Sequence, residues 1–383
     1  MAGDGGALDR AMRRHVERWG EVGLAARAPG RVNLIGDHTD HCDGFALPMA
    51  LPLDTAVALT STGDPASGAV VVEAAGFGVV ELRPGREVPG WALHLAGVVD
   101  LLEAEGVASR GWVGCVDTDV PVGAGLSSSA ALEVALTTAL LARAGVAWPA
   151  RRVAELGRRV EHEAVGVPCG IRDQLVSAGA TEGCASLLDA RSGELSPVPL
   201  PPGVVVAVLD TATRRELADG AYAERRASCE RAAAALGLGA LRDATAADVD
   251  RLDDPTDRRR ARHVVTEDDR VLAVVAALGA GDVERAGALM SESHASLRDD
   301  FEVSGPGLDR IVEVAEGAPG CLGARMTGGG FAGCAVALVR EGSGEAFVAD
   351  VVERYDLGGR RAVVRLCPPS AGASVVSRRP PAR

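Results

Sequence analysis

A glycine- and serine-rich segment, PVGAGLSSSAALEVAL, begins at Pro121 and ends at Leu136. Glycines, then three serines, then an alanine-rich apolar stretch are typical of a loop that opens into a helix. The unpaired amides and the dipole at a helix N-terminus can bind phosphate. An ordinary glycine turn with a serine cap would have the same composition. Taken alone, the segment leaves both interpretations open.

The chain contains no lysine, so every basic side chain apart from histidine is an arginine. A Walker-type phosphate loop requires a lysine after its last glycine. That class of nucleotide site is therefore excluded. If the serine segment binds phosphate, it must do so with amides, hydroxyls and a metal ion.

A second segment, APGRVNLIGDHTDHCDGFALPMAL, spans Ala28 to Leu51 and concentrates charge in a glycine-bounded loop. Its Arg31, Asp37, His38, Asp40 and Asp43 stand beside apolar stretches. Carboxylates and imidazoles suit a sugar, because its hydroxyls both donate and accept hydrogen bonds. A solvated turn capped by its own aspartates is the alternative. So many charges beside apolar strands favour a sugar-binding loop.

A third segment, MTGGGFAGC, spans Met326 to Cys334 and has three consecutive glycines between two apolar runs. Glycine is disfavoured inside strands. A plain hairpin explains three of them poorly. Close approach of the backbone to a ligand, or to the serine segment, explains them better.

Composition limits the possible partners and compartments. The 383 residues favour two domains. The formal net charge of −13 argues against nucleic acid and anionic membrane as partners. Eight scattered cysteines without CxxC pairs indicate reduced thiols, and hence a cytoplasmic protein. We see no signal peptide at the N-terminus and no apolar run of membrane-spanning length.

Helices and strands alternate in both halves of the chain, which favours an α+β fold. The serine segment follows a predicted strand and opens a predicted helix. SPVPLPPG, residues 196–203, is the best linker candidate, and DRRRARH, residues 257–263, is interpreted as a solvated face. We expect a disordered tail, SRRPPAR. The predicted helices are 7–19, 93–105, 130–144, 151–165, 222–236, 268–278 and 282–301, and the predicted strands are 55–60, 69–74, 112–117 and 204–210, with strand–turn–strand units at 25–48 and 321–339.

Together these segments closely resemble the galactokinases of the GHMP kinase family. The family patterns GRVNLIGEHTDY and PxGxGLSSSAxLE correspond to GRVNLIGDHTDH and to residues 121–133 here. CGIMDQ corresponds to CGIRDQ, residues 169–174. ESHxSLRDDxEVS and SRMTGGGFGGC correspond to ESHASLRDDFEVS and ARMTGGGFAGC. The resemblance runs from about Leu24 to Val339, and the first pattern with SLRDD points to galactokinases in particular.

The resemblance implies a two-domain GHMP kinase fold, divided into residues 1–200 and 201–383, with the active site between the domains. It implies Mg²⁺- and ATP-dependent phosphorylation of D-galactose at its anomeric hydroxyl, in a monomer. Asp173 corresponds to the family's base and Arg31 to the arginine that lowers the pKa of this base. Ser129 and Glu161 correspond to the magnesium ligands. The resemblance assigns ATP to Gly123, Ala124, Gly125, Leu126, Ser127, Ser128 and Ser129, and the sugar to Asp37, His38, Thr39, Asp40, Gly170 and Tyr222.

Four departures from the family pattern lie around the predicted sugar site. Asp37 replaces Glu, His41 replaces Tyr, Cys42 replaces Asn and Arg172 replaces Met. None removes a catalytic group. They leave open a related hexose or a cyclitol as substrate. A catalytically inactive sugar sensor is a further alternative, but the complete serine segment, Arg31 and Asp173 favour catalysis.

Overall fold

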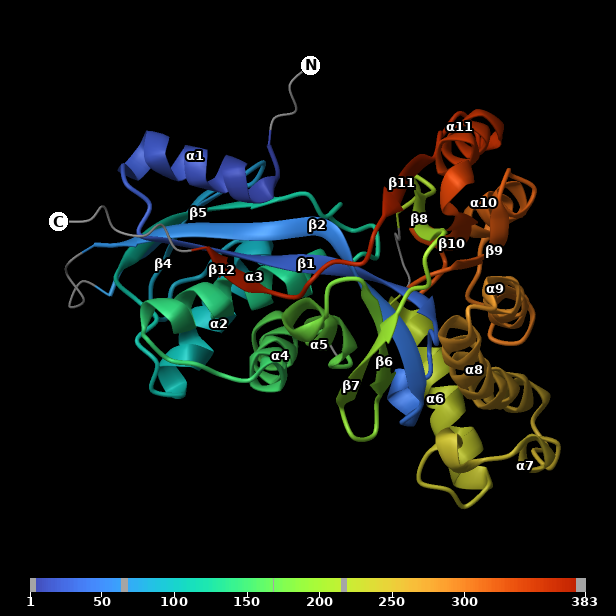
Figure 1. Ribbon diagram of the computed structural model, residues 1–383. Helices are drawn as coiled ribbons and strands as arrows, with labels where there is room; N and C mark the ends of the chain where they lie inside the picture. Colours follow the sequence, from blue (N-terminus) through green and yellow to red (C-terminus); the bar gives the residue numbers. More distant parts are fainter. Residues whose placement is uncertain (1–4, 63–67, 168, 215–218, 377–383) are drawn as a thin grey trace.

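The computed structural model describes residues 5–62, 68–167, 169–214 and 219–376. In these ranges the strands form one eight-stranded and one four-stranded sheet (Figure 1). The larger sheet has the order β12-β1-β2-β5-β3-β4, with β6 and β7 attached through β2. Its strands are β1 (Leu24–Ile35), β2 (Phe45–Ser61), β3 (Val70–Ala74), β4 (Gly78–Leu82), β5 (Trp112–Thr118), β6 (Cys184–Asp189), β7 (Glu194–Pro199) and β12 (Ser374–Val376).

Helices cover the larger sheet on both faces, with α1 on one face and α2 to α5 on the other (Figure 1). Val98, Trp112 and Leu140 are buried in the core between the sheet and α2 and α3. The aliphatic core therefore holds the serine loop between a strand, β5, and a helix, α3. The helices are α1 (Ala7–Trp19), α2 (Leu93–Ala104), α3 (Ser128–Arg143), α4 (Ala150–Arg159) and α5 (Arg172–Gly179), with a π-helical turn, η4 (Val160–Val165), after α4.

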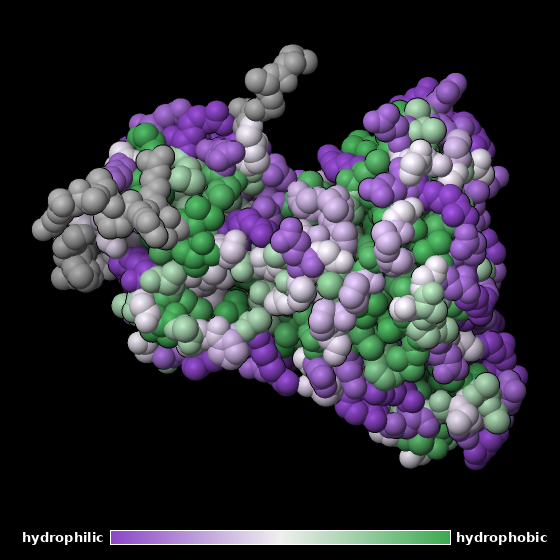
Figure 2. All heavy atoms as spheres, viewed as in Figure 1, coloured by the Kyte–Doolittle hydropathy of each residue, from purple (hydrophilic) through white to green (hydrophobic). Residues whose placement is uncertain are grey.

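The smaller sheet has the antiparallel order β11-β8-β10-β9. The packing of α10 and α11 against it buries Phe347 and Ile311. The space-filling view shows two lobes separated by an indentation, with α1 on one lobe and α11 on the other (Figure 2). The strands are β8 (Val204–Asp210), β9 (Cys321–Met326), β10 (Cys334–Arg340) and β11 (Val363–Cys367), and the helices are α6 (Asp219–Ala235), α7 (Ala246–Val249), α8 (Pro255–Ala280), α9 (Val283–Asp299), α10 (Pro306–Glu316) and α11 (Gly344–Arg354).

The mixed architecture confirms the α+β prediction, and the predicted helices and strands all occur, with ends shifted at several of them. The division near residue 200 stays a prediction. One C-terminal segment crosses this division, because β12 pairs antiparallel with β1 in the larger sheet. The predicted disordered tail, residues 377–383, lies outside the part of the chain that the structure describes.

Two sequence interpretations were wrong. The predicted linker was wrong in its first half, which lies in β7, a strand that pairs with β6, whereas residues 200–203 do connect the two sheets. Prolines are tolerated on such an edge strand, because an edge has free positions without a ladder hydrogen bond. The predicted solvated face lies in α8, where Arg260 and His263 are buried. His263 contacts the Ser296 hydroxyl at 3.0 Å.

Candidate active site

The three glycine-containing segments of the sequence meet at one cavity of about 940 Å³. The first segment forms the end of β1, the 3-10 turn η1 (Asp40–Cys42) and the start of β2. The serine loop joins β5 to α3, and the third segment is the turn from β9 to β10. The cavity wall also includes residues of α5 and α6. As predicted, the fold brings together segments that lie up to about 300 residues apart.

Asp173, at the start of α5, lies at the centre of this cavity wall. Arg31 on β1 binds both of its carboxylate oxygens, with Nε 2.7 Å from Oδ1 and Nη2 in contact with Oδ2. Arg31 Nη1 also donates to the Gly125 carbonyl at 2.8 Å, and the Ser127 hydroxyl donates to Asp173. The arginine thereby ties the serine loop to the carboxylate.

The charge balance around Asp173 keeps it ionised. Burial alone would raise its pKa, but Arg31, Arg172 and the Ser127 hydroxyl outweigh burial and lower the pKa to about 2. Its side chain is still 29% exposed, whereas that of Arg31 is only 6% exposed. The site therefore presents a fixed, negatively charged hydrogen-bond acceptor to the cavity at neutral pH.

The serine loop turns sharply into α3. Ser127, the N-cap residue of α3, has a φ of 62°, and Gly123 and Gly125 also have positive φ. Opposite the loop, Gly333 has a φ of 99°, and a Cβ there would lie 2.9 Å from the Ala124 carbonyl oxygen. A Cβ on Gly328 would lie 3.4 Å from the Gly125 carbonyl oxygen. The third segment needs glycine because its backbone packs directly against the serine loop.

All but one of the predicted ATP residues line the cavity. The exception is Leu126, whose side chain is 1% exposed and packs in the core beside Val32. Its carbonyl accepts a hydrogen bond from the Arg31 amide at 3.1 Å. The Leu126 side chain therefore helps to hold the loop against β1, and its assignment to the ATP site stays a prediction.

Ser129 and Glu161, the predicted metal ligands, are direct neighbours. The Ser129 hydroxyl donates to Glu161 Oε1 at 2.7 Å, on the first turn of α3. Both are oxygen donors of the kind that Mg²⁺ prefers. Next to them His94 Nδ1 lies 2.9 Å from Glu133 Oε1. Burial, despite bonds from His94 and Gln174, raises the pKa of Glu133 to about 7.

Asp40, Gly170 and Tyr222 are the predicted sugar residues that line the cavity. A Cβ on Gly170 would lie 2.6 Å from Asp40 Oδ2, so glycine lets the 169–172 loop pack against this carboxylate. Burial, together with Asp40, raises the pKa of Tyr222. Its hydroxyl therefore stays protonated and able to donate.

Asp37, His38 and Thr39 lie behind the wall and are each at most 3% exposed. Asp37 accepts from Arg325 at 2.9 Å, from the Gly328 amide at 3.2 Å and from the Asn33 amide. The hydroxyl of Thr39 contacts two backbone carbonyls. Protein groups bond to both side chains, and the sugar contacts of Asp37 and Thr39 stay predictions.

His38 packs among aromatic rings behind the same wall. Its centroid lies 4.7 Å from that of Phe301 and 5.7 Å from that of Tyr222. His38 has a positive φ of 65°, so the chain turns sharply here. The imidazole supports the Tyr222 ring, which itself reaches the cavity.

Arg172 is the site residue whose role the sequence did not reveal. Its guanidinium contacts three carboxylates, with Nη1 3.7 Å from Asp40 and 3.9 Å from Asp37, and Nε 3.4 Å from Asp173. Nη1 is buried and makes no hydrogen bond within the described part of the chain. The sequence drew attention to Arg172 only because it replaces the family's Met beside the predicted base.

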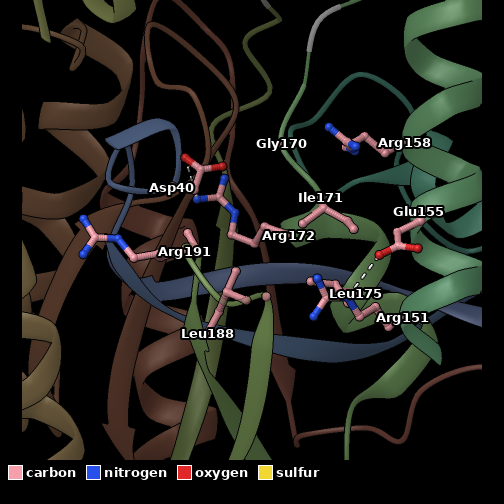
Figure 3. Close-up of a pocket in the computed structure, with 12 residues that line it drawn as sticks. Asp40, Arg151, Glu155, Arg158, Gly170, Ile171, Arg172, Leu175, Leu188 and Arg191 are labelled. Atoms are coloured by element: carbon pink, nitrogen blue, oxygen red, sulfur yellow. Dashed lines mark hydrogen bonds and ion pairs between the residues drawn. The ribbon is translucent and has the colours of Figure 1, made fainter. Parts of the chain in front are cut away.

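Arg172 also borders a second cavity of about 270 Å³ (Figure 3). Asp40, Gly170 and Arg172 line both cavities. Figure 3 shows Asp40 and Arg172 pointing toward one another at one end, with Arg151 and Glu155 at the other. The Asp40–Arg172 contact therefore forms part of the wall between the two spaces.

Comparisons with known proteins agree with this geometry. A galactokinase galactose-binding signature matches residues 13–61, and the GHMP kinase N-terminal and C-terminal domains match residues 94–180 and 274–357. Galactokinase from Chloroflexus aurantiacus is 42% identical over 362 residues, covering 92% of this chain and 93% of that one. Galactokinase from Streptomyces coelicolor is 42% identical over 359 residues, with coverage of 90% and 92%.

Among solved structures, Lactococcus lactis galactokinase complexed with galactose has a TM-score of 0.88 and 30% identity, covering 95% of this chain and 98% of that one. The mevalonate kinase of Methanococcus jannaschii, at 17% identity and a TM-score of 0.68, shares the fold. The matched ranges lie in both lobes, and the relatives cover at least 90% of the chain. The chain therefore belongs to the galactokinases of the GHMP kinase family.

Proposed function

We propose that this enzyme transfers the terminal phosphoryl group of ATP to the anomeric hydroxyl of D-galactose, giving galactose 1-phosphate and ADP. One observation carries the proposal. The ionised Asp173 carboxylate lies between the amide-rich serine loop and the wall formed by Asp40, Gly170 and Tyr222. Phosphoryl transfer depends on such positioning and on charge neutralisation.

Asp173 accepts the hydrogen bond of the sugar hydroxyl and takes its proton as the new O–P bond forms. With a pKa of about 2 it is a weak base. Its main task is therefore to orient the hydroxyl, and proton transfer accompanies phosphoryl transfer. Arg31 holds the carboxylate with two nitrogens and places positive charge beside the transferring group.

The serine loop binds the phosphates of ATP through its amides and hydroxyls, because the chain has no lysine to replace them. Ser129 and Glu161 would hold Mg²⁺, and their oxygens are already adjacent. When bound, the ion neutralises phosphate charge. Gly328 and Gly333 form the side of the cavity opposite the serine loop with their backbone, because glycine has no Cβ that would obstruct it.

Asp40, Tyr222 and the Arg172 guanidinium hold the outer hydroxyls of the sugar. Asp40 supplies an acceptor, whereas Arg172 Nη1 supplies a buried donor with no hydrogen bond of its own. A related hexose or a cyclitol is the second candidate substrate. The observation that favours it is this arginine, which adds a donor where related galactokinases have an apolar methionine.

A coupled assay of ADP release with a panel of hexoses and cyclitols tests the proposal. We expect galactose to give the highest kcat/KM. A higher value for another sugar would favour the second candidate. ATP and sugar binding without turnover on any of them would indicate a sensor and contradict both.

The proposal includes a monomer that works in the cytoplasm. All eight cysteines are unpaired, which suits a reducing compartment. No helix in the described ranges is long and apolar enough to cross a bilayer. Light scattering coupled to size exclusion would test the monomer, and cell fractionation would test the location.

A further inference from the structure

Two of the residues that depart from the family pattern, His41 and Cys42, meet a third side chain that lies far away in the sequence. The third side chain is that of Cys229 on α6, which lies beside Cys42 on η1. His41 Nδ1 lies 3.2 Å from the Cys42 sulfur. The three ligand atoms all lie within 4.8 Å of one another. The fold therefore assembles two thiols and an imidazole that the sequence separates by almost 190 residues.

We propose that His41, Cys42 and Cys229 form a binding site for a thiolate-preferring cation such as Zn²⁺, separate from the magnesium site. The spacing fits. With Zn–S bonds of about 2.3 Å and Zn–N bonds of about 2.0–2.1 Å, a tetrahedral site needs S···S near 3.8 Å and S···N near 3.5 Å. The 3.2 Å between His41 Nδ1 and the Cys42 sulfur is close to this S···N separation, and no two of the three ligand atoms lie more than 4.8 Å apart. A fourth position remains for water.

The surroundings favour metal over a plain hydrogen-bonded cluster. Cys42 and Cys229 are 5% and 1% exposed and belong to an apolar cluster with Phe301 and Leu297. A divalent cation, two thiolates and a neutral imidazole form an uncharged complex, which apolar surroundings tolerate.

The site adjoins the sugar-binding wall. His41 is partly exposed. Its ring lies 6.1 Å from that of Tyr222, and it directly follows Asp40. A bound ion would link η1 to α6, the two elements that carry these sugar-facing residues. We therefore expect the ion to stabilise the protein and to slow hydrogen exchange in residues 39–43 and 219–229.

Metal titration of the reduced, metal-free full chain tests the proposal. We expect one equivalent of Zn²⁺ to bind in competition with a chromophoric chelator. Two protons should leave with each ion bound, because both thiols must ionise. Cd²⁺ should give a thiolate charge-transfer band, and Mg²⁺ should not compete, since it prefers oxygen ligands.

Substitutions assign the site. Cys42→Asn restores the residue of related galactokinases and should weaken Zn²⁺ binding at least about 100-fold, beyond the 10–100-fold cost of losing an outer-shell partner. Cys229→Ser should do the same. Cys321→Ser is the matched control, because it removes a partly buried thiol from β9, and it should leave binding unchanged.

Three results would overturn the proposal. They are the absence of stoichiometric Zn²⁺ binding, binding that survives Cys42→Asn, and a thiol pair that oxidises to a disulfide yet holds no metal. If Cys229→Ser fails to fold, Cys42→Asn still decides the question, since asparagine at that position is compatible with the family fold. An increase in Tm with Zn²⁺ in wild type, lost in Cys42→Asn, would support the site independently.

Discussion

The serine loop and the loop of predicted sugar residues 37–40, here called the sugar loop, border the same cavity. They are built in opposite ways. The serine loop borders the cavity with its glycines and its three serines and buries two apolar side chains, those of Ala124 and Leu126. The sugar loop buries most of its polar groups. Its Asp37 is surrounded by protein donors, and only Asp40 of its predicted sugar residues lines the cavity.

This difference separates two ways of preparing a binding site. Phosphate groups carry their own charge, so a loop of open amides and hydroxyls is sufficient for them. Sugar hydroxyls are neutral, so a protein recognises them by the direction of their hydrogen bonds. The loop that faces them must therefore be rigid, and the buried Asp37–Arg325 pair fixes it to β9. Changes in the first loop should affect turnover, whereas changes at the buried side chains of the second should affect folding.

The largest effect on turnover is expected from Asp173→Asn, where the two regions meet. The amide cannot take the hydroxyl proton, and losing a general base costs about 10²–10⁴-fold in rate. We expect kcat to fall by this amount in the ADP-release assay, while calorimetry gives sugar affinity within a few-fold of wild type. Turnover close to wild type would show that Asp173 is not the base.

Asp37→Ala should separate stability from binding in the sugar loop. Removing one partner of a buried ion pair costs about 3–5 kcal/mol, because the other charge stays buried. We expect such a loss in urea denaturation. The matched variant, Asp40→Ala, should cost little stability but raise the sugar KM by about 10-fold or more, as expected for a lost charged acceptor. Similar stability losses in both would refute the comparison.

Glu161→Gln should weaken Mg²⁺ binding beside the serine loop without affecting the sugar side. An amide is a poorer ligand than a carboxylate, so we expect the Mg²⁺ concentration for half-maximal activity to rise at least about 10-fold. Sugar affinity should not change. Glu163→Gln, on the same π-helical turn but paired with Arg159 at the surface, is the control. An unchanged Mg²⁺ requirement would remove Glu161 from the metal site.

The pH dependence of stability offers a further test of the buried side of the sugar loop. Asp268 accepts from the Phe45 amide at 2.6 Å, and burial raises its pKa to about 7. In the unfolded chain the same group ionises near pH 3.9. Its contribution is therefore complete below about pH 4 and is lost as the pH rises through 7, by at most about 1.4 kcal/mol per unit.

Asp268→Asn should remove this pH dependence of the free energy of unfolding, because the asparagine side chain can still accept from the Phe45 amide but does not ionise. Urea denaturation of both proteins at several pH values between about 5 and 8 measures it. Asp269→Asn, which changes an exposed neighbour on the same helix, should keep the wild-type slope. If the slopes of wild type and Asp268→Asn coincide, Asp268 does not titrate in this range.

The smallest effect is expected from Arg172→Met, which restores the residue of related galactokinases. One donor to the sugar is lost, and a hydrogen bond contributes about 0.5–1.5 kcal/mol net. We expect the galactose KM to rise roughly 5-fold, with a smaller change in kcat. A lower KM with methionine would mean that Arg172 was selected for a different sugar.

Much of this site could be predicted from the sequence, because glycine and serine patterns report local backbone requirements. The serine loop and the close approach of Gly328 both followed from such patterns. The pairing of Arg31 with Asp173 came only from family resemblance, since 142 residues separate them. The sequence did not predict which polar side chains are buried. Nothing in the sequence indicates that Asp37 is buried, because its partner Arg325 lies 288 residues away along the chain.

Charged stretches were misleading for the same reason. Arg260 and His263 lie in a run that looks solvated, but tertiary partners on α9 and beyond bury them. The prolines of β7 suggested a linker, since sequence alone does not distinguish an edge strand from a loop. Local propensity describes each segment well, whereas burial depends on neighbours distant in the chain.

The pairing of β12 with β1 has a consequence for how the protein forms. Residues 370–376 make backbone hydrogen bonds to Ala50, Ala180 and Ser177 and then extend the larger sheet. The N-terminal lobe therefore lacks an edge strand until almost the entire chain has left the ribosome. A chain truncated after residue 369 should expose the β1 edge and aggregate more readily than the full chain. Completion of the first lobe must wait for the last strand to be synthesised, so this kinase cannot finish folding one lobe at a time during translation.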